Sequence, residues 1–189
     1  MKKHIHSLAC GASMLLLAAC NPTAGDKTES GERSADMKAR FTVLNQAFNT
    51  GQTEAIDSLL SANSEDHTVD TAMHSPKGPA GLKQMIAEMR SGSPDLKSEI
   101  KHMAVDGDIL IAYGTISGTN SGPMMGMPAT NKKWSGNFCD VVKFGSDMKM
   151  TDHWGVYDDL KIMKDLGLIP SMPPPAAAVN GKVDTVIVK

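Results

Sequence analysis

The sequence predicts an α+β domain in which helices pack against one face of a curved antiparallel sheet. Apolar residues recur at helical spacing in the first half of the chain and alternate with polar residues in the second half. Helices that precede a run of strands are typical of this class. The chain has 189 residues, enough for one domain with a substantial core.

The first half is expected to form three helices. The first spans Ser34–Gly51, because serine favours N-caps and glycine ends helices. Its apolar stripe consists of Met37, Phe41, Leu44 and Phe48. A short second helix begins near Thr53, and the polar stretch Ser61–Gly78 is expected to be a loop. The third helix spans Pro79–Gly92, with proline in its first turn.

The second half is expected to form four strands, Lys97–Val105, Asp108–Thr119, Lys132–Phe144 and Met148–Tyr157. Asp106-Gly107 is a strong hairpin signal between the first two. A loop rich in glycine, proline and methionine, Asn120–Asn131, precedes the third strand. A tight turn beginning at Gly145 connects the last two. This order predicts an antiparallel meander.

The chain is expected to end in a helix and a tail. The helix spans Asp159–Leu166, with Asp158 as its N-cap rather than a catalytic residue. The tail, residues 169–189, is rich in proline and alanine and should be extended. Its apolar end, Val183–Val188, could pair with a sheet edge or stay loose.

The first twenty residues predict export and lipidation. Lys2 and Lys3 precede a short apolar run, Leu8–Leu17, which is typical of a cleaved signal peptide. The small residues before Cys20 resemble the lipobox of bacterial lipoproteins; the alternative is an ordinary secretory signal. The expected organisation is a lipoprotein signal peptide over residues 1–19 and, over 20–33, a lipidated cysteine with a flexible tether. The folded domain then covers residues 34–168.

The lipobox resemblance implies a protein of the cell envelope. Cys20 would carry a diacylglycerol on its thiol and a fatty acyl chain, palmitate for example, on its amine. An aspartate directly after the lipidated cysteine would resemble an inner-membrane retention signal, but residue 21 is an asparagine. This favours the outer membrane where the source has two membranes. Cys139 would then be the remaining thiol and is expected to be a small buried hydrophobe.

Charge and motifs exclude several function classes. The formal net charge is −2, and no basic patch indicates nucleic acid. The histidines lack the spacing of a zinc site, so no metal is expected. The sequence also lacks a phosphate-binding glycine loop and a Gly-x-Ser-x-Gly motif.

Short motifs distributed along the chain carry a family resemblance. They are Ala47–Gly51, Gly78-Pro79, Pro94–Leu96, Val105–Asp108, Ser117–Asn120, Gly126–Thr130, Trp134–Gly136, Asp152–Gly155 and Asp165–Gly167. In this order and spacing they resemble the SnoaL-like polyketide cyclase, or ester cyclase, family over about Ser34–Gly167. The resemblance implies a cystatin-like, nuclear transport factor 2-like cone with a pocket at its open end.

The resemblance also implies a mechanism and a departure from it. Characterised members use a pocket aspartate as general acid and base in an intramolecular aldol ring closure, without metal or cofactor. The position of that aspartate falls at Gly155, which carries no proton. A pocket histidine of the cyclases falls at Asp140 on the preceding strand.

The candidate catalytic residues are His153 and Asp140. Strand alternation puts His153 on the face of Gly155, where Asp140 on the next strand could raise its basicity and form a general base with it. The alternative is that both are structural wall residues. Trp134 and Trp154 are interpreted as core or dimer-face residues.

Four further residues are candidates for ligand binding. His67 could line the pocket or lie in a solvated loop, and Tyr113 could donate to a ligand or simply pack in its strand. Met125 and Met127 are expected at the pocket rim.

These observations favour a lipid-anchored envelope protein that binds a small, largely apolar molecule. The alternatives are an acid/base cyclase or hydrolase using His153 with Asp140, and a non-catalytic envelope interaction module. A membrane reached through Cys20 and a small molecule are the expected partners. The family resemblance also implies a homodimer through the outer sheet face, as relatives often form one.

Overall fold

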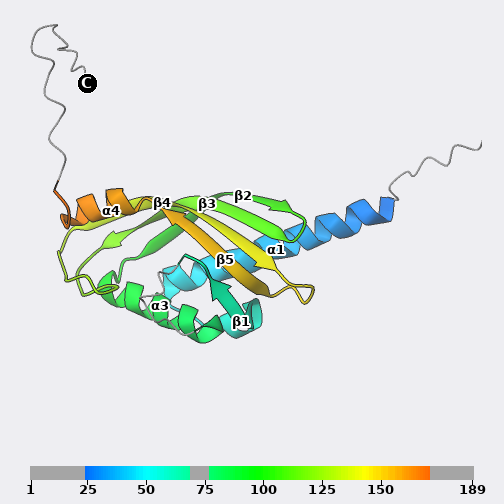
Figure 1. The fold of residues 1–189 in the computed structure, drawn as a ribbon, viewed down its shortest axis with the longest axis horizontal. Coiled ribbons are helices and arrows are strands. Elements are labelled where there is room, and N and C mark those ends of the chain that lie inside the picture. The colour runs from blue at the N-terminus through cyan, green and yellow to red at the C-terminus, as the bar shows by residue number, and fades with distance from the viewer. Residues whose placement is uncertain (1–23, 69–76, 171–189) are drawn as a thin grey trace, which may run out of the picture.

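The computed structural model describes residues 24–68 and 77–170, with side chains from Ser30 onward (Figure 1). The expected signal peptide, Cys20 and the tail from residue 171 lie outside the described residues, so the structure does not test them. Its helices lie between Ala24 and Leu166. None of these helices is long and apolar enough to cross a membrane.

In the part of the chain that the structure describes, one curved sheet of five strands forms the body of the domain. Its strands are β1 (Leu60–Asp66), β2 (Lys97–Asp106), β3 (Ile109–Thr119), β4 (Lys133–Phe144) and β5 (Met150–Tyr157). Their order across the sheet is β1-β5-β4-β3-β2. Strands β2 to β5 form the expected antiparallel meander, and β1 pairs parallel with β5 at the edge. The α+β class is thereby confirmed.

Strand β1 corrects the expectation of a loop from Ser61. Its sequence is Leu-Ser-Ala-Asn-Ser-Glu-Asp, and only Leu60 and Ser64 are buried. A serine occupies the buried position where an apolar residue would have revealed the alternation. Pairing with β5 stabilises a strand that the sequence pattern does not predict, and it brings Asp66 opposite His153.

Within the described residues, four helices accompany the sheet: α1 (Ala24–Thr50), α2 (Ile56–Leu59), α3 (Gly78–Gly92) and α4 (Asp159–Leu166). Figure 1 shows α1 and α3 on the same side of the sheet. There Met37 and Phe41 of α1 and Ile86 of α3 form one core cluster with residues of the sheet. Helix α4 packs against β4. Helices on one face agree with the expected cone.

Helix α1 is longer than expected and replaces part of the tether. It begins at Ala24, so residues 24–33 are helical and Ser34 is not an N-cap. The segment contains no proline, and the guanidinium of Arg33 binds the carbonyl oxygen of Gly145 at 3.2 Å and the sulfur of Met148 at 2.8 Å. These contacts hold the helix against the β4–β5 turn. A flexible tether would make no such fixed contacts.

The expected turns are found, with one change at α4. Gly51, Gly107 and Gly167 all have positive φ, at the end of α1, in the β2–β3 hairpin and at the end of α4 respectively. Asp158 holds the N-cap position but makes no capping hydrogen bond. Its carboxylate instead accepts from the backbone and side-chain N–H of Asn137, at 2.9 and 2.7 Å.

A second core cluster closes the other end of the sheet. It contains Leu96, Ile116, Met124, Trp134, Phe138 and Leu166. Trp134 is buried, as expected, and its indole N–H donates to Ser93 Oγ at 3.0 Å. Phe48 and Ile100 pack against both clusters. A cavity lined by residues of both clusters, Phe41 and Phe138 among them, contains the site.

Candidate functional site

A cavity of about 430 Å³ lies between the concave face of the sheet and helices α1 and α3. Much of its wall is apolar, for example Phe41, Leu44, Leu82, Met85, Ile116 and Phe138. These side chains belong to the amphipathic faces of α1 and α3 and the inward faces of β3 and β4. Such volume and lining are usual for a small-molecule site.

Four polar residues form a hydrogen-bonded cluster on the cavity wall, which we call the His153 cluster: Asp66, Asp140, His153 and Tyr157. His153 Nδ1 lies 3.0 Å from Asp66 Oδ1, and Nε2 lies 3.3 Å from Asp140 Oδ1. The Tyr157 hydroxyl donates to the same Asp140 oxygen at 3.2 Å. Strand β5 supplies His153 and Tyr157, while its two neighbours supply the carboxylates.

The two carboxylates keep His153 protonated. Burial disfavours the charged imidazole, but the hydrogen bonds and charges of Asp140 and Asp66 outweigh it and raise the pKa of His153 to about 9. For Asp66, burial acts against ionisation, yet its bonds with His153 and Thr68 lower its pKa below the usual value. His153 is therefore an imidazolium at neutral pH, and the expected role of general base does not fit it.

Tyr157 stays neutral in the environment of the His153 cluster. Burial, followed by the adjacent charge of Asp140, raises the pKa of the phenol above its ordinary value. Its hydroxyl is thus a hydrogen-bond donor to Asp140 rather than a proton acceptor.

The register and the packing explain why position 155 carries a glycine. Gly155 lies directly opposite Asp140 in the β4–β5 ladder. A Cβ at Gly155 would lie 2.7 Å from the Tyr157 ring and 3.1 Å from Thr68 Oγ1. The missing side chain therefore makes room for Tyr157, and the carboxylate on this part of the wall belongs to Asp140 on the neighbouring strand.

His67 lines the cavity and pairs with Asp152 rather than with a residue of the His153 cluster. Its Nε2 is 3.1 Å from Asp152 Oδ1, and this bond lowers the pKa of Asp152. The imidazole also stacks on Trp154, with ring centroids 4.6 Å apart. Both His67 and Asp152 line the cavity.

The structure leaves three of the expected ligand-binding residues outside the cavity. Tyr113 is exposed on the outer face of β3, where it stacks with His102. Met125 is exposed in the loop after β3, and Met127 packs against the second core cluster. The loop folds on itself through paired backbone hydrogen bonds between Met124 and Met127, and neither Met125 nor Met127 lines the cavity.

Sequence reasoning brought His153 and Asp140 together but missed Asp66 and Tyr157. Tyr157 follows Gly155 by two residues, so strand alternation already placed it on the pocket face. Asp66 carried no such signal, because its strand was not recognised. Within residues 24–68 and 77–170, no group of three or more His, Cys, Asp or Glu side chains could hold a metal ion.

The fold and cavity define an α+β cone of the cystatin-like, nuclear transport factor 2-like class. The SnoaL-like polyketide cyclase family matches residues 39–166, and the chain therefore belongs to that family. Among curated proteins, none is similar enough in sequence to match.

Solved structures share the fold. TsrD from Streptomyces laurentii is 24% identical with a TM-score of 0.65, over 71% of this chain and 97% of TsrD. A Bacillus cereus protein assigned as a polyketide cyclase is 27% identical with a TM-score of 0.60, over 71% of this chain and 83% of its own. A SnoaL-like polyketide cyclase from Agrobacterium tumefaciens is 19% identical with a TM-score of 0.58, over 69% and 98%. These likenesses concern the fold, which hosts several functions.

Proposed function

We propose that this SnoaL-like domain binds a small, largely apolar molecule in its cavity. The observation that carries the proposal is the cavity of about 430 Å³, with its apolar wall and its one His153 cluster. Burying a ligand there contributes about 0.8 kcal/mol per methylene group, and the cluster can orient one polar group of the ligand. The family name of the structural neighbours supports a small organic ligand.

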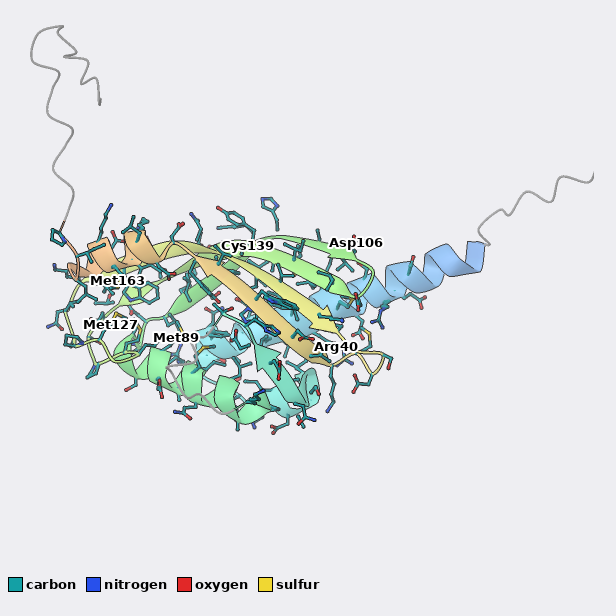
Figure 2. All side chains as sticks on the ribbon, in the orientation of Figure 1. Arg40, Met89, Asp106, Met127, Cys139 and Met163 are labelled. Carbon is teal, nitrogen blue, oxygen red and sulfur yellow. The ribbon has the colours of Figure 1, made fainter. Side chains whose placement is uncertain are left out.

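The test is to identify what co-purifies with the protein. The full chain is purified from cells and extracted with solvent, and the extract is analysed by mass spectrometry. A Met85→Trp variant places a larger side chain in the cavity wall, and Met163→Trp makes the same change on α4, away from the cavity (Figure 2). We expect a stoichiometric apolar compound with wild type and Met163→Trp, and its loss with Met85→Trp. Equal amounts in both variants would contradict cavity binding.

A second candidate function is acid/base catalysis on that molecule, favoured by the His153 cluster. Asp140 is the proton acceptor in this candidate, because His153 is already protonated, and the imidazolium stabilises negative charge beside it. This candidate keeps the expected pair of residues and makes Asp140, rather than His153, the proton acceptor. A carbonyl compound with an acidic C–H bond is the matching substrate class, as in the ring closures of the family.

Hydrogen exchange separates catalysis from binding. The extracted compound is returned to the purified protein in D2O, and deuterium incorporation at carbon is followed by mass spectrometry. Catalysis predicts exchange with wild type and with Asp106→Asn, a matched change at the distant β2–β3 hairpin (Figure 2), and none with Asp140→Asn. If wild type binds the compound but incorporates no deuterium at carbon, the catalytic candidate is refuted and the binding function stands.

We also propose that Cys20 is lipidated and attaches the domain to the cell envelope, in the outer membrane where the source has two. The support is the signal-like sequence and the small residues before Cys20. Metabolic labelling with an alkyne fatty acid tests it. Label is expected on wild type, and its persistence on Cys20→Ala would refute this site of attachment.

A further inference from the structure

The donors of the His153 cluster face its own carboxylates, and the cluster leaves an acceptor at the cavity wall. His153 has a carboxylate oxygen at each ring nitrogen, which requires a proton on both. The Tyr157 hydroxyl is also taken, by Asp140 Oδ1. Within the described part of the chain, nothing donates to Asp140 Oδ2, and the Asp140 side chain keeps 14% of its surface exposed. A ligand group that meets this cluster must therefore donate.

The ion pairs along the cavity leave one negative charge unmatched. Lys77 pairs with Glu65 at 2.6 Å, and His67 pairs with Asp152 at 3.1 Å. The remaining cation, His153, is shared by Asp66 and Asp140. Even with His67 given a full positive charge, the described lining holds four carboxylates against three cations. The excess negative charge lies within the His153 cluster.

The other polar groups of the wall do not reverse this preference. Asn45 and Ser98 bond to each other, with Ser98 Oγ donating to Asn45 Oδ1 at 2.6 Å. The amide of Asn45 donates to the Ser98 carbonyl oxygen at 3.2 Å. The Ser64 hydroxyl can donate or accept and so selects neither sign. The raised pKa of His153, about 9, means that this imidazole keeps its positive charge at neutral pH.

We propose that the cavity selects an amphiphilic cation, an apolar molecule whose amine or ammonium group donates to Asp140 Oδ2. A neutral hydroxyl can make the same bond without the charge, and a carboxylate is repelled. This inference rests on the proposed binding function and names the class of ligand. It assigns Asp140 the role of specificity-determining residue, with His153 and Tyr157 positioning its carboxylate.

Three probes of one chain length test the inference: octylamine, octanol and octanoate. Their binding to the full chain, synthesised in a membrane-free extract so that no lipid is attached, is measured by calorimetry at neutral pH. We expect octylamine to bind about tenfold more tightly than octanol, as a hydrogen bond to a charged group implies, and octanoate to bind most weakly. Asp140→Asn should abolish the advantage of octylamine over octanol, whereas Asp106→Asn should retain it.

The outcomes distinguish this inference from the function on which it rests. If octanoate binds as tightly as octylamine, the charge preference is refuted while binding of an apolar molecule stands. If none of the three probes binds, the proposed binding of an apolar molecule is refuted, and so is the inference that rests on it. Should Asp140→Asn fail to fold, the order of the three probes on the wild-type protein still decides.

Discussion

At the residue scale, the charge of His153 couples the site to the stability of the fold. The imidazolium lies between two carboxylates from different strands, so it holds β1 and β4 to β5. Removing the proton leaves those carboxylates without their shared cation. A buried pair that loses one charge is strongly destabilised, which makes this contact sensitive to pH.

The free energy of unfolding should therefore fall as the pH rises. The pKa of His153 is raised from 6.5 to about 9, so its stabilisation is fully present below pH 6.5 and is lost as the pH rises through about 9. The loss should reach at most about 3 kcal/mol. Urea unfolding across this range measures it. Tyr157, whose pKa is also raised, acts in the same direction at higher pH.

Two histidine variants serve as controls for this pH dependence. His153→Gln should flatten the profile, because the titrating group is gone. His102→Gln changes an exposed histidine on the outer face and should leave the slope intact. A wild-type profile that is flat between pH 6.5 and 9 would show that His153 is not held as an imidazolium.

The residues of the cluster also show which part of a site the sequence can reveal. The pairing of His153 with Asp140 was predictable because the family resemblance pointed to Gly155 and Asp140, and strand alternation put His153 on the face of Gly155. Asp66 was not, because its contact with His153 depends on parallel pairing between segments 87 residues apart. Pairing at that distance leaves no local pattern in a strand as polar as β1.

At the scale of elements, the expected and observed boundaries agree best where glycine or proline marks them. Helix α4 has the expected bounds, and the β2–β3 hairpin turns at Gly107 as expected. Helix α1 differs because polar residues without an apolar stripe are compatible with either a tether or an exposed helix. Its extension is decided by a tertiary contact, that of Arg33 with the β4–β5 turn, which no local pattern displays.

A substitution at Gly31 tests the extension of α1. Gly31 lies inside the helix, is exposed, and has open space where a Cβ would be. Alanine there should stabilise the protein by up to about 1 kcal/mol, because glycine loses more backbone entropy in a helix. Proline there should destabilise it. Thermal unfolding of the two variants provides the comparison, and a flexible tether would make both changes silent.

At the scale of the whole molecule, the cavity is the feature that is hardest to predict from the sequence. The apolar stripes of α1 and α3 and the alternation of the strands predict that these faces meet. They do not predict how much space remains between them, because that depends on the curvature of the sheet and on side chains from several elements. The family resemblance, not periodicity, supplied the expectation of a pocket.

The outer face of the sheet carries two apolar rows that cross three strands. Ile111, Val141 and Trp154 are aligned in register on β3, β4 and β5. Tyr113, Cys139 and Val156 form the next row on the same face. Four of these six side chains are exposed, and Val156 retains 72% of its accessible surface. A contiguous apolar patch on the surface is typical of an interface.

We therefore propose that two copies of the chain associate through this face, and we expect sedimentation equilibrium to give the mass of a dimer. Val156→Asp should shift the protein to monomer, because a carboxylate would be buried without a partner. Val43→Asp makes the same change at an exposed position on α1 and should leave the dimer intact. A monomeric wild type would contradict the proposal, and so would dissociation by both variants alike, since a specific interface depends on where the charge is placed.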